Sequence, residues 1–168
     1  MNLLQQERSA YLQLHKHNPI HWYPWGDAAF QAARESGKPM LLSIGYAACH
    51  WCHVMAEESF SQEDLAGVAN RFYICVKVDR EELPAVDTVY MNACQLLTGR
   101  GGWPLQILAT PDGLPFFAFT YLPKDQLSAL LVNVAMEWSQ QREAYEQAAR
   151  AITDQLVGHA QSIQPARP

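Results

Sequence analysis

Residues 40–60 read MLLSIGYAACHWCHVMAEESF, and they predict a strand, a turn and a helix around two cysteines. The run 40–44 is apolar and has strand length, residues 45–48 are typical of a turn, and residues 50–60 have a helical pattern. Cys49 and Cys52 are three residues apart at the helix start, where such side chains lie about 5–6 Å from each other. This separation is close to the Cα spacing of a disulfide. The stretch therefore predicts a redox-active dithiol.

The two cysteines are expected to play different parts. At a helix start, unpaired N–H groups and the positive end of the helix dipole favour a thiolate, which indicates that Cys49 is the nucleophile and Cys52 the resolving thiol. An imidazole beside the thiolate would lower its pKa further and make the disulfide more oxidising, so His50 is a candidate for tuning. The alternative for His50 is a plain solvated side chain.

The motif is compatible with three other interpretations. His50 and His53 interleave with the cysteines and could complete a zinc or copper site, although four ligands from one short turn would close a tetrahedron with difficulty. The string CHWCH also matches a c-type haem attachment site, but the sequence shows neither a distal ligand nor an export signal. A pair of inert buried thiols is the third alternative. We predict no metal and no cofactor, and interpret His53 as a helix-surface residue.

Composition narrows the class of protein. The chain has 168 residues, 49% of them hydrophobic, which suits one domain with one core. Twelve basic and 17 acidic side chains give a net charge of −5 without blocks of like charge, so nucleic acid and membrane are not expected as partners. Residues 1–11 lack an apolar signal region, and the default expectation is a cytoplasmic protein. Cys75 and Cys94 lie in apolar patterns and are expected to be inert core residues.

The remaining chain predicts a mixed sheet with helices on both faces. Residues 1–26 are expected to be an irregular aromatic strap, residues 27–160 the domain with its C-terminal helices, and residues 161–168 a flexible tail. Asp27 is expected to cap the first helix, and Ser61 with Asp64 to form a capping box. The expected helices are 27–36, 50–60, 61–71, 84–97 and, with a bend near 139, the region from 124 onward. The expected strands are 40–44 and 73–78, parallel, and the hairpin 105–109 with 114–121, antiparallel. This order is that of a thioredoxin-like fold with a mixed sheet of about four strands.

Trp103-Pro104 is the second part of the predicted site. A proline that opens a strand can be cis, and a cis bond would turn the backbone at residue 103 toward the cysteines, where an extended substrate could pair with it. A trans proline at a strand edge is equally compatible with the pattern. We expect Tyr46, Trp51 and Trp103 to form an apolar rim around the dithiol.

Several motifs resemble one family. They are NPIHWYPWG at 18–26, SIGY at 43–46, CHWCHVM at 49–55, KVDREE at 77–82 and LTGRGGWP at 97–104. From about Ser9 to Tyr121 the chain resembles the N-terminal thioredoxin-like domain of the spermatogenesis-associated protein 20 family. The resemblance implies a thioredoxin-like fold, a Cys49–Cys52 redox pair and Pro104 as the cis-proline that faces it.

The sequence departs from the family pattern in two ways and differs from thioredoxin in a third. Full-length members continue into a large helical toroid, so the chain is either a stand-alone relative or an excised domain. Position 21 is usually acidic in the family and is His here. Ser43 stands where thioredoxin carries a buried acid, so Glu81, Glu82 or His50 would have to help Cys52 lose its proton.

These observations together predict a thiol–disulfide oxidoreductase that uses the Cys-His-Trp-Cys dithiol. Its partners would be a protein or small-molecule disulfide substrate and an unknown redox partner. The alternatives are a non-catalytic binding module that uses the same groove, and a metal-binding domain built on the Cys/His cluster.

Overall fold

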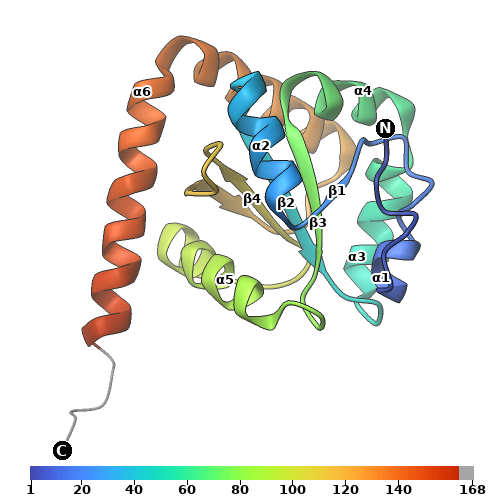
Figure 1. Cartoon of the computed structure of the whole chain (residues 1–168), viewed down its shortest axis with the longest axis horizontal. Helices are drawn as coiled ribbons and strands as arrows, with labels where there is room; N and C mark the ends of the chain where they lie inside the picture. The colour runs from blue at the N-terminus through green and yellow to red at the C-terminus, as the bar shows by residue number, and fades with distance from the viewer. Residues whose placement is uncertain (163–168) are drawn as a thin grey trace, which may run out of the picture.

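The computed structural model describes residues 1–162, with side chains up to residue 158, as a five-stranded mixed sheet covered by helices (Figure 1). The elements in chain order are α1 (Ala10–Gln13), β1 (Tyr23–Pro24), α2 (Asp27–Ser36), β2 (Met40–Gly45), α3 (His50–Met55), η1 (Ala56–Phe60), α4 (Glu63–Phe72), β3 (Ile74–Asp79), α5 (Pro84–Thr98), β4 (Leu105–Ala109), β5 (Pro115–Phe119) and α6 (Lys124–Ser162). The strand order is β1-β3-β2-β4-β5. The predicted pairing is confirmed, because β2 and β3 are parallel and β4 and β5 form an antiparallel hairpin.

The prediction of about four strands missed β1. This strand lies in the segment that was expected to be irregular, which also contains the short helix α1. Two residues are too few to show an alternating pattern, and Pro24 argues against a strand except at an edge. β1 forms because Tyr23 and Pro24 pair in parallel with Val76 and Lys77 of β3. A contact across the sheet, rather than local sequence, therefore creates it.

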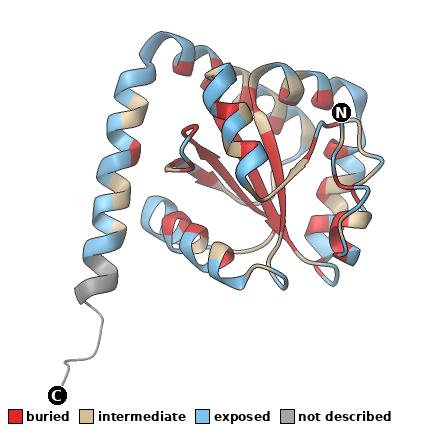
Figure 2. Cartoon of the chain, viewed as in Figure 1, coloured by how far each residue is buried: buried red, intermediate tan, exposed pale blue. Residues whose placement is uncertain are grey.

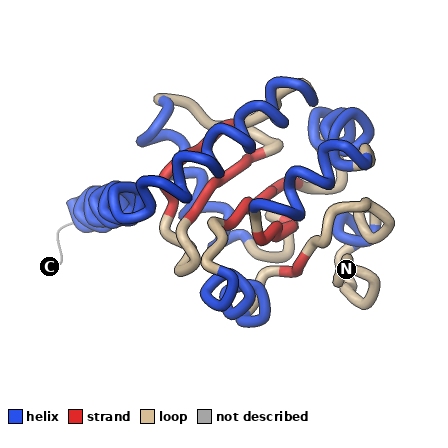
Figure 3. The backbone as a smooth tube through the Cα atoms, turned by 90° about the horizontal axis from the view of Figure 1, so that it is seen from above, coloured by secondary structure: helices blue, strands red, loops and turns tan. Residues whose placement is uncertain are grey.

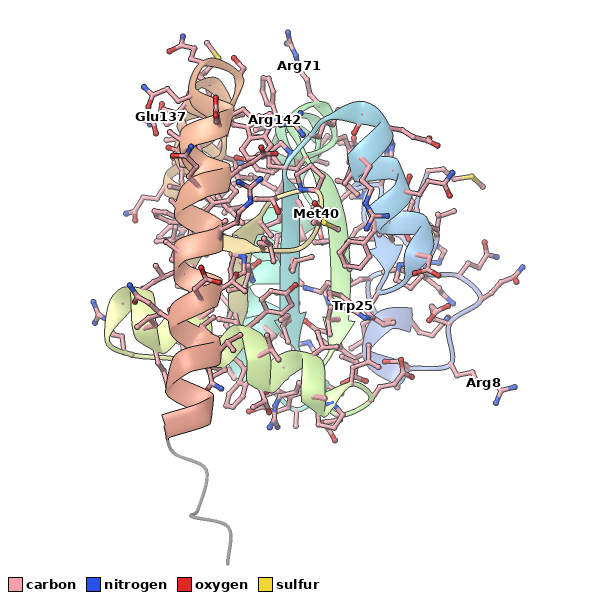
Figure 4. The ribbon with its side chains drawn as sticks, turned by 60° about the vertical axis from the view of Figure 1, so that its left-hand side comes forward. Arg8, Trp25, Met40, Arg71, Glu137 and Arg142 are labelled. Atoms are coloured by element: carbon pink, nitrogen blue, oxygen red, sulfur yellow. A yellow bond between two sulfur atoms is a disulfide. The ribbon has the colours of Figure 1, made fainter. Side chains whose placement is uncertain are left out.

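Both faces of the sheet are buried, which explains why its strands read as nearly continuous apolar runs (Figures 2 and 3). Alternate residues of β2 enter two separate cores. Leu41 packs with the core formed by the strap, α3, α4 and α6, whereas Met40 and Leu42 pack with the core under α2 and α5. Figure 4 shows Trp25 and Met40 on the second side, where the Trp25 ring lies 5.1 Å from that of Phe30.

Two helix starts differ from the prediction. Gly26, rather than Asp27, occupies the N-cap of α2, and Asp27 lies in the first turn, where its charge suits the helix dipole. The capping box at Ser61 and Asp64 does not form. Ser61 is instead the C-cap of the short π-helix η1, and its hydroxyl donates a hydrogen bond to the Ala56 carbonyl. Helix α4 begins after Gln62 without a side-chain cap.

Helix α6 bends at Gln141, close to the predicted bend near residue 139. Before the bend it covers α4 and β5, and after it the helix runs beside α5 (Figure 1). Trp138 Nε1 donates to the Gly37 carbonyl at 3.0 Å, which ties the bend to the end of α2. Of the tail expected at 161–168, only residues 161 and 162, the last of α6, are described, and 163–168 lie outside the described residues. Within residues 1–162, no helix combines the length and the apolar character needed to cross a membrane.

Candidate redox site

Cys49 and Cys52 form a disulfide at the carboxyl end of β2, with their Cα atoms 5.3 Å apart. Cys49 is the N-cap of α3, and its Sγ accepts a hydrogen bond from the backbone N–H of Cys52 at 3.2 Å. The spacing argument for a disulfide is therefore confirmed. Both residues are buried, Cys49 at 4% and Cys52 at 1% exposure.

Two aromatic side chains predicted for the rim, Tyr46 and Trp103, pack against the disulfide and against each other. Their ring centroids are 5.8 Å apart in an edge-to-face arrangement, and the Arg80 guanidinium lies 4.3 Å from the Trp103 ring centre. Asp87, which is buried on α5, accepts a hydrogen bond from Trp103 Nε1 at 2.8 Å and bridges Arg80 at 3.3 Å. One carboxylate thus fixes the indole and the cation beside it. The Trp103–Pro104 peptide bond is cis.

A shallow cleft of about 220 Å³ opens next to these residues and is lined by Trp51, Gly101, Gly102, Trp103, Thr120 and Tyr121. Trp51 is 52% exposed, which is unusual for so large an apolar side chain. Its ring lies 5.0 Å from that of Tyr121. The cleft therefore offers aromatic and glycine surface beside the dithiol, on the side of the cis-proline.

The sheet carries a buried lysine beside Ser43, the position at which thioredoxin has an acid. Ser43 and Lys77 are register partners on β2 and β3, and Lys77 Nζ donates to Ser43 Oγ at 2.8 Å. Burial lowers the pKa of Lys77 well below its ordinary value. The amine lies among three aromatic rings and is closest to Phe60, at 4.6 Å from the ring centre. A lysine in an otherwise apolar strand was a signal in the sequence, but its partner could not be predicted.

The first part of the N-terminal strap, residues 1–22, covers the same side of the site. Tyr11 and Leu12 of α1 join Cys49 and Cys52 in one buried cluster. Ser9 caps α1 and donates its hydroxyl to Asp79 Oδ2 at 2.6 Å, which fixes the strap to the end of β3. The sequence indicated a strap but gave no reason to place Tyr11 at the cysteines.

The other predicted site residues lie at the surface. His50 is exposed, with its ring 5.4 Å from that of Trp51, and Glu81 and Glu82 are exposed as well. His53 is exposed, as expected, and hydrogen-bonds to the Ala47 carbonyl. Among the residues with described side chains, no group of three or more His, Cys, Asp or Glu residues could hold a metal ion. Cys75 and Cys94 are free and buried, as predicted.

This arrangement was compared with known proteins. The family model Thioredox_DsbH, described as a protein of unknown function, DUF255, matches residues 1–157. The chain belongs to this family. Relatives of this Thioredox_DsbH chain include the uncharacterized protein B0495.5 of Caenorhabditis elegans, 44% identical over 157 residues, and spermatogenesis-associated protein 20 of Homo sapiens, 39% identical over 166 residues. The matches cover 90% and 95% of the chain but only 22% and 21% of these relatives, so the chain spans about a fifth of their length. The resemblance inferred from the motifs is confirmed.

Solved structures confirm the thioredoxin-like fold of this Thioredox_DsbH chain. A DsbH oxidoreductase aligns with a TM-score of 0.54 and 15% identity, over 70% of the chain and 85% of that protein. A thioredoxin from Thermus thermophilus aligns with a TM-score of 0.56 and 15% identity, over 71% of the chain and 89% of that protein. At this level of identity the likeness shows the fold alone.

Proposed function

We propose that this domain is a thiol–disulfide oxidoreductase. The observation that carries the proposal is the Cys49–Cys52 disulfide at the junction of β2 and α3, in which Cys49 is the N-cap of the helix. Proteins that share this fold include a DsbH oxidoreductase and a disulphide isomerase of Xylella fastidiosa, so the fold together with the Cys49–Cys52 disulfide is compatible with the same chemistry here.

In the proposed reaction, the Cys49 thiolate attacks one sulfur of a substrate disulfide. A mixed disulfide forms, and the other substrate sulfur leaves with the electron pair and takes up a proton. Cys52 then attacks Cys49 Sγ, which releases the second substrate thiol and leaves the Cys49–Cys52 disulfide. Two electrons pass to the substrate, and a dithiol partner must return them for the next cycle.

The substrate is expected to lie in the cleft between Trp51 and Trp103. The backbone N–H and C=O groups of an extended peptide in this cleft would lie within reach of the domain's own backbone beside the cis Trp103–Pro104 bond. Tyr46 and Trp103 would exclude water from the reacting sulfurs. We also propose a cytoplasmic location, because the four cysteines do not form a disulfide framework of the kind that small secreted proteins use.

The test is reduction of insulin disulfides by the purified protein, with dithiothreitol as electron donor. Cys49→Ser is expected to remove the activity, and Cys52→Ser to accumulate a mixed disulfide that mass spectrometry detects. Cys94→Ser, which alters a buried cysteine outside the site, is the matched control and is expected to remain active. Activity that persists in Cys49→Ser would contradict the mechanism, whereas a wild-type protein without activity would favour the non-catalytic binding module.

A further inference from the structure

The hydroxyl of Tyr11 is a buried polar group without a partner. Tyr11 is 1% exposed, and its hydroxyl is one of three buried side-chain polar atoms among the residues with described side chains that make no hydrogen bond; the others are Ser59 Oγ and Gln106 Oε1. A buried polar group without a hydrogen-bond partner costs free energy, and one explanation for keeping it is that it gains a partner in another state of the protein. Tyr11 therefore calls for a functional explanation.

The Tyr11 hydroxyl and the sulfur of Cys52 both lie against Gly45, and the two residues belong to one buried cluster. A Cβ atom built on Gly45 would be 2.7 Å from Cys52 Sγ and even closer to the Tyr11 hydroxyl oxygen, so both atoms approach Gly45 too closely to leave room for a methyl group. Gly45 thus leaves open the path between hydroxyl and sulfur. In the oxidised protein Cys52 Sγ is bound to Cys49 and carries no charge, so it is a weak acceptor.

Cys52 must become a thiolate to resolve a mixed disulfide, and it is almost fully buried. Burial disfavours a thiolate because it removes the surrounding water, unless a hydrogen-bond donor of the protein takes the place of that water. The neighbouring amine of Lys77 is bound to Ser43, and the acidic candidates Glu81 and Glu82 are exposed. Burial raises the pKa of Tyr11, so its hydroxyl keeps its proton and remains a donor at every physiological pH.

We propose that the Tyr11 hydroxyl donates a hydrogen bond to the Cys52 thiolate and is a catalytic residue of the resolving step. This inference rests on the proposed function. Cys52 gives up its proton, which passes to the departing substrate sulfur, and its thiolate, held by Tyr11, attacks Cys49 Sγ. The Cys49–Cys52 bond forms as the bond from Cys49 to the substrate breaks, and the departing substrate sulfur takes up a proton. Tyr11 keeps its own proton throughout.

Tyr11→Phe tests this role because it removes only the hydroxyl. The reduced protein is mixed with excess 5,5′-dithiobis(2-nitrobenzoate), and release of thionitrobenzoate is followed by stopped flow. The first phase reports attack by Cys49, and the second reports resolution by Cys52. A Cys49→Ser, Cys52→Ser double variant gives the background from Cys75 and Cys94.

Tyr11→Phe is expected to slow the second phase and leave the first unchanged. A 10- to 100-fold loss of thiolate, offset by the greater nucleophilicity of a more basic sulfur, gives a resolution rate lower by roughly 3- to 15-fold. Tyr73→Phe is the matched control, because it also removes a buried hydroxyl. The Tyr73 hydroxyl donates to the Leu131 carbonyl, and Tyr73 lies just before β3, at the end of the strand opposite to the redox site. It should leave both phases unchanged.

Three results would overturn the inference: a wild-type second phase in Tyr11→Phe, equal slowing of both phases, or the same slowing in Tyr73→Phe. Failure of the proposed function is a separate result, because the wild-type protein itself would then lack a fast second phase.

Discussion

Asp87 fixes Trp103 and Arg80 beside the redox site, and its replacement by alanine tests how much these contacts contribute to the free energy of unfolding. Its carboxylate is 6% exposed, accepts from Trp103 Nε1 at 2.8 Å and meets Arg80 Nε at 3.3 Å. A hydrogen bond to a charged acceptor contributes about 1.5–3 kcal/mol. The pair with Arg80 adds about 0.2–1 kcal/mol, because that side chain is 35% exposed and partly solvated.

Asp87→Ala is therefore expected to lower the free energy of unfolding by about 2–3 kcal/mol. For a domain of this size the melting temperature should fall by roughly 5–10 °C. Urea unfolding of the oxidised protein, followed by tryptophan fluorescence, gives the first value, and thermal unfolding followed by circular dichroism gives the second.

Asp112→Ala is the matched control. The Arg34–Asp112 pair is shorter, at 3.0 Å, but its side chains are 60% and 69% exposed, so water screens it. This variant should lose less than about 1 kcal/mol. Equal losses in the two variants would refute the reasoning, because burial rather than the length of the ion pair is expected to decide the cost.

Two further perturbations address the strap and the core. Gly45→Ala places a Cβ atom 2.7 Å from the Cys52 sulfur and even closer to the Tyr11 hydroxyl, so the free energy of unfolding should fall by about 1–3 kcal/mol. Gly67→Ala, in open space within α4, should instead raise it by about 0.5–1 kcal/mol. A loss of stability in Gly67→Ala comparable to that of Gly45→Ala would contradict this reasoning. Burial lowers the pKa of His15 from 6.5 to about 2, so the unfolded chain binds a proton below pH 6.5 that the folded protein does not, and stability falls as the pH drops through this window. His15→Phe keeps the aromatic packing and should lose about 2–3 kcal/mol less than the wild type between pH 7 and pH 4.5 in urea unfolding, whereas parallel losses would show that His15 does not contribute.

Local sequence was a good guide to the elements of this domain. Gly37 and Gly99 end α2 and α5 with positive φ, so the observed helix ends, Ser36 and Thr98, lie within one residue of the expected ends at 36 and 97. The prediction was less accurate at helix starts, where Gly26 rather than Asp27 is the cap, since several polar residues near a start can serve and the tertiary contacts choose among them.

The predicted site was found only in part. Cys49 and Cys52 pair as expected, and Tyr46 and Trp103 meet beside them. His50 was singled out because it is adjacent to Cys49 in sequence, yet its side chain lies at the surface. Adjacent residues on a helix point in different directions, so a neighbour in sequence is not a neighbour in space.

The sequence by itself determined that a Cys-x-x-Cys pair stands between a buried strand and a helix, because strand and helix periods and the spacing of the cysteines are local properties. Only the tertiary structure decided what surrounds the pair. Lys77 meets Ser43 through the register of two parallel strands, Asp87 meets Trp103 between a helix and a loop, and Tyr11 reaches Cys52 from the strap. Each contact joins residues that are distant in the chain, and the packing of the whole core, rather than any short motif, sets which of them come together.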